Sequence, residues 1–179
     1  MTTQPIAGNQ NFTVITNAAA QLSELNVGKL AVADGRLTEF TVIGYAPNGF
    51  GTAAVGTKLN LNNAPGKDQA VSTTDPNLLR LPKRVKVLSA YATNNGTTIT
   101  GSGAQLDVGL NATLAASPSA PPALVDTSIA NVNTGVFGVP SAPPGVVATT
   151  TETFGAVEVK TAALTAGDLK VRITLMALP

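Results

Sequence analysis

The chain has 179 residues, of which 44% are hydrophobic and 12% are charged, and its 11 basic and 10 acidic residues give a formal net charge of +1. It contains no His, Cys or Trp, which excludes an imidazole base, a thiolate nucleophile, a disulfide and a Cys/His zinc site. A charge so close to zero also provides no field that would attract a polyanion.

The N-terminal part of the chain predicts an extended segment followed by short strands. Residues 1–10 have neither the basic nor the apolar region of a signal peptide, and we expect them to be extended. Residues 18–25 (AAAQLSEL) favour either one or two helical turns capped by Asn17 or a further strand. Asp34-Gly35 predicts a tight hairpin. The strands expected here cover 11–16, 29–32 and 37–45.

Alternation of apolar and polar residues predicts the strands in the middle of the chain. A strand over 58–61 is followed by a segment, 62–82, whose Asn, Asp and Pro residues indicate a loop. The next strand is expected to place Val85, Val87, Ser89 and Tyr91 on one face and Lys86, Leu88 and Ala90 on the other. After a turn at Asn94-Asn95-Gly96, we expect a short strand over 97–100 and another over 105–110.

Six prolines distinguish the segment from Ser117 to Gly145, where Ser-Ala-Pro-Pro occurs at 119–122 and again at 141–144. Because proline fixes φ, we expect two stiff, extended arms, 117–122 and 140–145, on either side of a short strand near 129–139. The six are Pro118, Pro121, Pro122, Pro140, Pro143 and Pro144.

The C-terminal strands show the clearest alternation. From Leu169 to Ala177, Leu and β-branched residues alternate with Lys170, Arg172 and Thr174, which is typical of a strand with one wet face. Just before it, Val157, Val159 and Thr161 alternate with Glu158 and Lys160. The loop between these strands, residues 164–168, has turn-forming residues.

About eight short strands separated by Gly, Pro and Asn predict an all-β fold. We expect a single antiparallel two-sheet β-sandwich over residues 1–179, jelly-roll-like, with long Pro- and Gly-rich loops. The side chains expected in its core are Val85, Val87, Leu106, Val108, Val157, Val159, Val171, Ile173 and Leu175.

No motif predicts catalysis, a cofactor or a metal. In the segment Gly51–Lys58 the final Thr-Lys reverses the order that a phosphate-binding loop requires. The ten carboxylates are scattered and form no Asp-x-Asp calcium string, and no Ser-x-x-Lys occurs. The uncharged run 108–125 contains prolines and predicts no membrane span. We therefore expect no enzyme activity, no cofactor and no metal site.

Basic residues are unevenly distributed along the chain. Arg80, Lys83, Arg84 and Lys86 form a cluster, but one this small with few aromatics makes nucleic-acid binding an unfavoured interpretation. No Lys or Arg lies between Lys86 and Lys160. Such a tract favours packing against neighbouring subunits, although a polar uncharged surface that simply dissolves remains the alternative. The candidate interface residues are Ser117, Pro118, Pro121, Pro122, Phe137, Pro140, Pro143 and Pro144.

The C-terminal half also resembles small jelly-roll or β-sandwich virion proteins of tailed phages and large DNA viruses. The resemblance rests on Leu81-Pro82 leading into 85–91 (VKVLSAY), then on 96–100 (GTTIT), 104–110 (AQLDVGL) and the closing 164–173 (LTAGDLKVRI). It implies a minor capsid, decoration (cement) or fibre-head protein, and it implies no catalytic residues.

The resulting hypothesis is a protein made in the host cytoplasm that stabilises a virion shell, forms a homo-oligomer, and contacts the major capsid protein and neighbouring virion subunits. A fibre-head or receptor-binding module is the first alternative. A carbohydrate-binding or carbohydrate-active domain is the second, and it requires Tyr45, Phe50 and Phe137 to gather in one cluster beside carboxylates.

Overall fold

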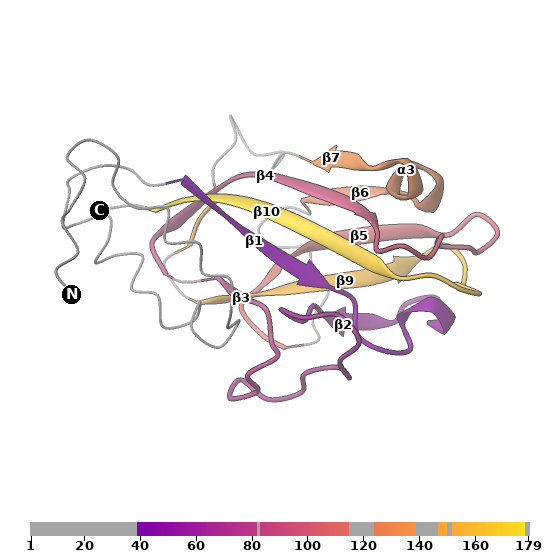
Figure 1. The fold of residues 1–179 in the computed structure, drawn as a ribbon, viewed down its shortest axis with the longest axis horizontal. Helices are drawn as coiled ribbons and strands as arrows, with labels where there is room; N and C mark the ends of the chain where they lie inside the picture. Colours follow the sequence, from indigo (N-terminus) through magenta and orange to yellow (C-terminus); the bar gives the residue numbers. More distant parts are fainter. Residues whose placement is uncertain (1–38, 82, 115–123, 139–146, 150–151, 178–179) are drawn as a thin grey trace, which may run out of the picture.

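The computed structural model describes residues 39–81, 83–114, 124–138, 147–149 and 152–177 (Figure 1). The strands, helix and hairpin expected before residue 37, and both proline arms, lie outside these residues. The described elements are β1 (Glu39–Tyr45), η1 (Phe50–Thr52), β2 (Lys58–Asn60), β3 (Arg80–Leu81), β4 (Val85–Asn94), β5 (Gln105–Asn111), β6 (Val125–Ser128), α3 (Ile129–Thr134), β7 (Val136–Gly138), β8 (Val147–Thr149), β9 (Thr153–Lys160) and β10 (Leu169–Ala177).

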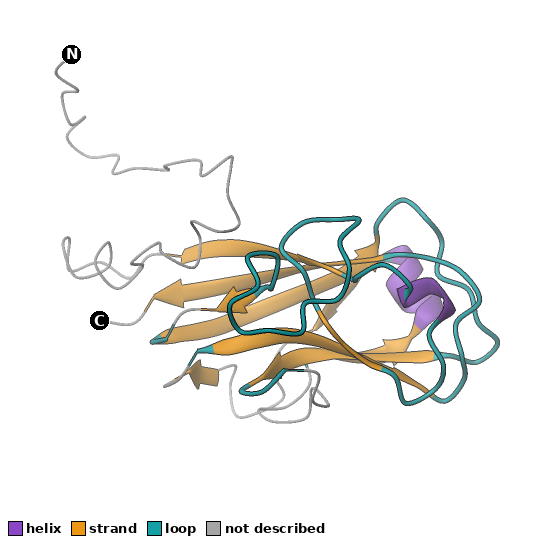
Figure 2. Cartoon of the chain, turned by 90° about the horizontal axis from the view of Figure 1, so that it is seen from below, coloured by secondary structure: helices purple, strands orange, loops and turns teal. Residues whose placement is uncertain are grey.

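The strands form two five-stranded sheets, and the paired strands are antiparallel. Sheet A has the order β1-β10-β4-β7, with β8 also pairing with β4, and sheet B has the order β2-β9-β5-β6, with β3 also pairing with β9. Figures 1 and 2 show the strands running along the long axis, with α3 at one end. The prediction of an all-β sandwich is confirmed.

The chain passes repeatedly from one sheet to the other. The first described strand, β1, lies beside the last, β10, in sheet A, while β2 lies beside β9 in sheet B. Early strands of the chain therefore pair with late ones in both sheets.

One hydrophobic core fills the space between the sheets. All nine side chains expected there are buried at 0% exposure. Their positions follow from alternation, because in a strand every second side chain points to the same face. In β10 the apolar residues point inward while Arg172 is exposed, as the sequence predicts.

In β9 the alternation ends at Lys160: Thr161 lies beyond the strand with a positive φ of 70° and is exposed. The prediction that Thr161 continues the strand is wrong.

A β-bulge changes the phase of β4. Thr174 of β10 pairs with Ser89 and Leu175 pairs with Val87, so Leu88 has no partner of its own. A bulge inserts one extra residue and reverses which side chains face inward beyond it. Ala90 and Ala92 are therefore buried, at 1% and 0% exposure, while Ser89 and Tyr91 are only partly buried. The prediction that Ser89 and Tyr91 share the face of Val85 and Val87 is wrong.

This bulge makes a testable difference between two adjacent residues. Ala90→Ser buries a hydroxyl in the core and is expected to lower the free energy of unfolding by about 1 to 2 kcal/mol. Ser89→Ala, on the other face, should change it by less than about 0.5 kcal/mol. Urea denaturation of both variants measures the difference, and equal effects would contradict the bulged register.

Two short strands expected from the sequence are replaced by other structure. Residues 97–100 contribute one isolated bridge, between Thr100 and Ala166, rather than a strand. The expected strand near 129–139 is α3 followed by β7. The Ser128 hydroxyl accepts a hydrogen bond from the Asn131 N–H and caps α3, and the Asn133 side chain bonds both the N–H and the C=O of Ile99 at 2.8 Å. Side-chain hydrogen bonds of this kind satisfy backbone groups that a strand would pair.

The other predictions for the described residues are largely confirmed. Strands begin and end close to the expected positions at β1, β2 and β5, and the Asn94–Gly96 turn follows β4. The long segment 62–82 is mostly loop, as expected, but contains β3. Together these elements leave the outer face of sheet A facing away from the core.

Candidate interaction surface

The outer face of sheet A carries one continuous row of side chains across four strands. Ile43 of β1 pairs with Arg172 of β10, Arg172 pairs with Tyr91 of β4, and Tyr91 pairs with Phe137 of β7. We call these four residues the outer row. Directly opposed residues of neighbouring strands have Cβ atoms roughly 5 Å apart, so the four side chains form one stripe.

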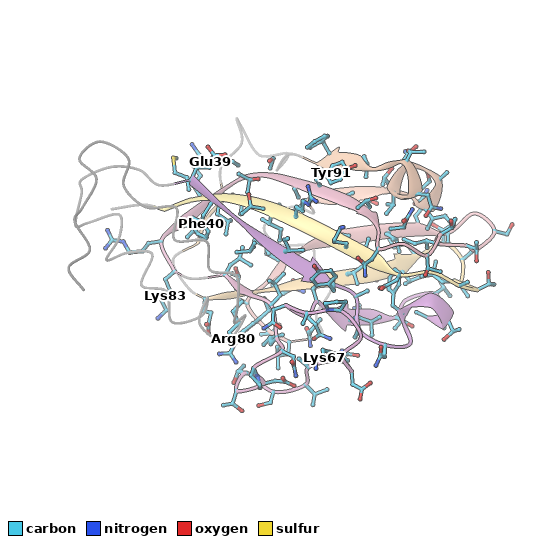
Figure 3. All side chains as sticks on the ribbon, viewed as in Figure 1. Glu39, Phe40, Lys67, Arg80, Lys83 and Tyr91 are labelled. Carbon is cyan, nitrogen blue, oxygen red and sulfur yellow. The ribbon has the colours of Figure 1, made fainter. Side chains whose placement is uncertain are left out.

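The aromatic end of the outer row is its most exposed part. Phe137 is 76% exposed and its ring centroid lies 4.6 Å from that of Tyr91, with 49° between the planes. Tyr91 lies over Gly135, where a Cβ would overlap the phenol hydroxyl and where φ is +86°. Because glycine has no Cβ, the Tyr91 ring can occupy this space beside β7 (Figure 3).

Charge on the same face is predominantly positive. The basic side chains on this face are Arg172 and Lys170 of β10 and Lys86 of β4. Among the described residues that point outward from sheet A, the acidic one is Glu39 of β1. The ion pairs formed among the described residues do not include Arg172. A stripe that combines an exposed arginine with two aromatic residues has a composition enriched at the centres of protein interfaces.

The outer face of sheet B has a different arrangement, with three carboxylates in register. Asp126 of β6 pairs with Asp107 of β5, which pairs with Glu158 of β9. We call these three residues the acidic row. The Lys160 ammonium lies 2.8 Å from Asp107 Oδ2 and 3.5 Å from Asp126 Oδ2.

Burial governs the electrostatics of this cluster. The Asp107 side chain is only 6% exposed, and burial raises the pKa of its carboxyl above 3.8, against the opposing effect of Lys160. The hydrogen bond to Asp107 raises the pKa of Lys160 above 10.5. Oδ1 of Asp107 has no hydrogen-bond partner. The ammonium therefore serves mainly to compensate a carboxylate that the fold has taken out of water.

The described residues assemble no recognisable metal site. They contain no group of three or more acidic residues placed to hold a metal ion. Gly51–Lys58 enters β2 from a three-residue 3-10 turn, without a helix N-terminus that could hold a phosphate. Within the same residues, no helix is sufficiently long and apolar to cross a membrane.

The aromatic cluster required by the carbohydrate hypothesis does not form. Phe50 is buried at 1% exposure, Tyr45 lies on β1, and Phe137 lies on β7. Since β1 and β7 are at opposite ends of the sheet A order, these rings cannot form one platform.

The basic cluster is divided between two roles. Arg80 donates hydrogen bonds to the carbonyls of Thr73 and Asp75 and lies 4.0 Å from Glu152, so it fixes the loop before β3. Lys83 and Arg84 are exposed between β3 and β4, and Lys86 belongs to the outer face of sheet A.

Phe137 is the one candidate interface residue that lies among the described residues. The other seven, from Ser117 to Pro144, lie outside them. No sequence pattern groups Phe137 with Tyr91, Arg172 and Ile43, because the bulge and the cross-strand register bring them together. The wet face of β10 was the signal that pointed to Arg172.

Comparison with known proteins gives few relatives. No protein-family model matches the chain, and no curated protein matches its sequence. Among solved structures, a chain of the acid-stable capsid of Helicobacter pylori bacteriophage KHP30 is similar at 12% identity and a TM-score of 0.46, over 80% of this chain and 95% of that one. A chain of the cyanophage Pam1 capsid asymmetric unit is similar at 17% identity and a TM-score of 0.43, over 80% and 86% respectively. Both similar chains come from phage capsids.

Proposed function

We propose that this chain is a structural protein of a virus particle, which packs on the shell and stabilises it. The observation that carries the proposal is the exposed outer row, in which Phe137, at 76% exposure, packs beside Tyr91, and Tyr91 in turn pairs with Arg172. A ring this exposed is costly in water, and burying it against another subunit recovers that free energy. An exposed aromatic and arginine stripe on an otherwise well-packed sandwich supports a role in binding rather than in reaction chemistry.

The character of the remaining surface supports the same function. Only 12% of residues are charged, so much of the surface consists of Thr, Asn, Ser and Ala, which lose less hydration free energy on burial than charged groups do. The proposed partners are the major capsid protein and neighbouring virion subunits. The proline arms, 117–122 and 140–145, are proposed to add contacts, because a proline-stiffened segment loses little entropy on docking.

The direct test is to find the chain in particles. Mass spectrometry of purified virions should detect it at a fixed ratio to the major shell protein. A ratio approaching that of the shell protein supports the decoration role, whereas a few copies per particle support a fibre or vertex role. Its absence from purified particles would contradict the proposal.

Deleting residues 117–122 is expected to leave the sandwich folded but to lower its copy number in particles by about tenfold, the effect of losing 1.4 kcal/mol of binding. Circular dichroism checks the fold, and the same mass spectrometry measures incorporation. As a control, Val71→Ser alters an exposed position, 80% accessible, in the loop 62–79 and should leave incorporation unchanged. Normal copy number for the deletion would show that this arm is not a contact.

A further inference from the structure

The outer faces of the two sheets differ in charge. Sheet A presents Arg172, Lys170 and Lys86 against Glu39, an excess of positive charge around the outer row. Sheet B presents the acidic row, in which Asp107 and Asp126 share the ammonium of Lys160. Lys58 lies in register with Glu158 at the far end of that row, so the negative character is concentrated toward β6.

The accessible part of the acidic row is Asp126. Its side chain is 56% exposed, and its 3.5 Å contact with Lys160 is longer than the 2.8 Å contact that Lys160 makes with Asp107. The loop 62–79 places Ala70 and Leu78 against Phe154, at the β2–β9 side of the sheet. The β5–β6 side of sheet B therefore offers an exposed carboxylate that Lys160 compensates only in part.

We propose that the outer row of one copy of this chain docks on the β5–β6 side of sheet B of a second copy, with Arg172 of one copy facing Asp126 of the next. The inference rests on the proposed function and names its partner as another copy of the chain. Complementary charge favours this pairing, since a two-fold dimer through the outer face of sheet A would bring together two faces that each carry an excess of positive charge.

The two faces point in opposite directions because they are the outer faces of one sandwich. A contact between unlike surfaces does not close on two copies; it continues into a ring or an open array. Such head-to-tail growth suits a protein that covers a shell. Phe137 supplies the apolar part of the contact, and Arg172 with Asp126 sets the orientation.

Charge exchange tests the pairing. Arg172→Glu and Asp126→Arg are made separately, and sedimentation velocity measures self-association over a range of chain concentrations. Each variant alone is expected to associate at least about tenfold more weakly than the wild type, because every contact then opposes like charges. An equimolar mixture of the two variants should recover association, since each contact again joins opposite charges. Lys83→Glu, a matched charge reversal away from both faces, should associate like the wild type.

Phe137→Ser should also weaken association by about tenfold or more, while Val71→Ser, at a comparably exposed position, should not. Circular dichroism confirms that every variant is folded. A wild-type chain that remains monomeric, an unaffected Arg172→Glu variant, or a mixture that fails to recover would each overturn the inference. If the chain is found in virions but these solution results fail, the proposed function stands and only the copy-to-copy contact is wrong.

Discussion

Ile173→Asp is expected to unfold the sandwich. Ile173 lies in β10, between Val42 of β1 and Ala90 of β4, and its side chain is 0% exposed. An aspartate there would either bury an unpaired charge or take up a proton, at a cost of several kcal/mol. A domain of this size is stable by only about 5 to 15 kcal/mol, so one such substitution removes most or all of the margin.

Thr174→Asp is the matched control for this substitution. Thr174 is the next residue of the same strand, half-buried on the outer face, with its hydroxyl 3.5 Å from that of Thr41. The new carboxylate reaches water there, and we expect a loss of about 1 kcal/mol or less. Far-UV circular dichroism and urea denaturation compare the two variants. Similar stability for both would show that β10 does not alternate between core and solvent.

Strands with one wet face were predictable from the sequence. In β10 charged or polar residues alternate with apolar residues at a period of two. This pattern places all the apolar residues on one face of a strand, whereas in a helix it would scatter them around the axis. The same reasoning located the second half of β9 and most of β5. Core membership followed directly, because the apolar set of a half-buried strand has only one face on which to lie.

Features that depend on partners distant in sequence were not predictable. The bulge at Leu88 arises from the pairing of β4 with β10, residues more than 80 positions later, and it moved Tyr91 from the expected face of Val85 and Val87 to the outer row. Likewise α3 is tied to Ile99 by the Asn133 side chain, which accepts a hydrogen bond from the Ile99 N–H and donates one to the Ile99 C=O, and a local pattern of apolar residues does not encode these contacts. The candidate surface combines four strands, so its membership appears only once the register is known.

Asp107 illustrates the same limit for charge. Alternation placed it opposite the core-facing residues of β5, where a carboxylate would ordinarily meet water. In the fold its side chain is 6% exposed and depends on Lys160 of β9, more than 50 residues later in the chain. The sequence contained both residues but no sign that they compensate each other.

Lys160→Met is the variant that measures this compensation. Methionine retains most of the aliphatic stem but leaves the Asp107 carboxylate buried without its counter-charge. Removing one partner of a buried ion pair costs about 3 to 5 kcal/mol, and the 35% exposure of Lys160 favours the lower end of that range. Lys58→Met, on the exposed cation opposite Glu158, is the matched control and should cost less than about 0.5 kcal/mol.

The pH dependence of unfolding gives a second readout that a simple packing defect would not produce. Burial raises the folded-state pKa of Asp107 above 3.8, and loss of Lys160 removes the opposing effect and should raise it further. A carboxyl whose pKa is raised by folding stabilises the fold in its protonated form, so stability is gained as pH falls through that pKa. The deficit of Lys160→Met should therefore be largest at neutral pH and shrink as the pH approaches 3.8.

The alkaline limb has the opposite origin. The pKa of Lys160 is raised above 10.5 by its hydrogen bond to Asp107, so its stabilising contribution is complete below 10.5 and is lost as pH rises through the folded-state value. The wild type should lose stability there, whereas Lys160→Met should not show this loss. Urea denaturation across the pH range measures both limbs.

Adding Asp107→Asn to Lys160→Met should recover most of the neutral-pH deficit, because the buried charge is then gone. A deficit that is constant with pH and unchanged in the double variant would mean that Lys160 contributes packing rather than charge.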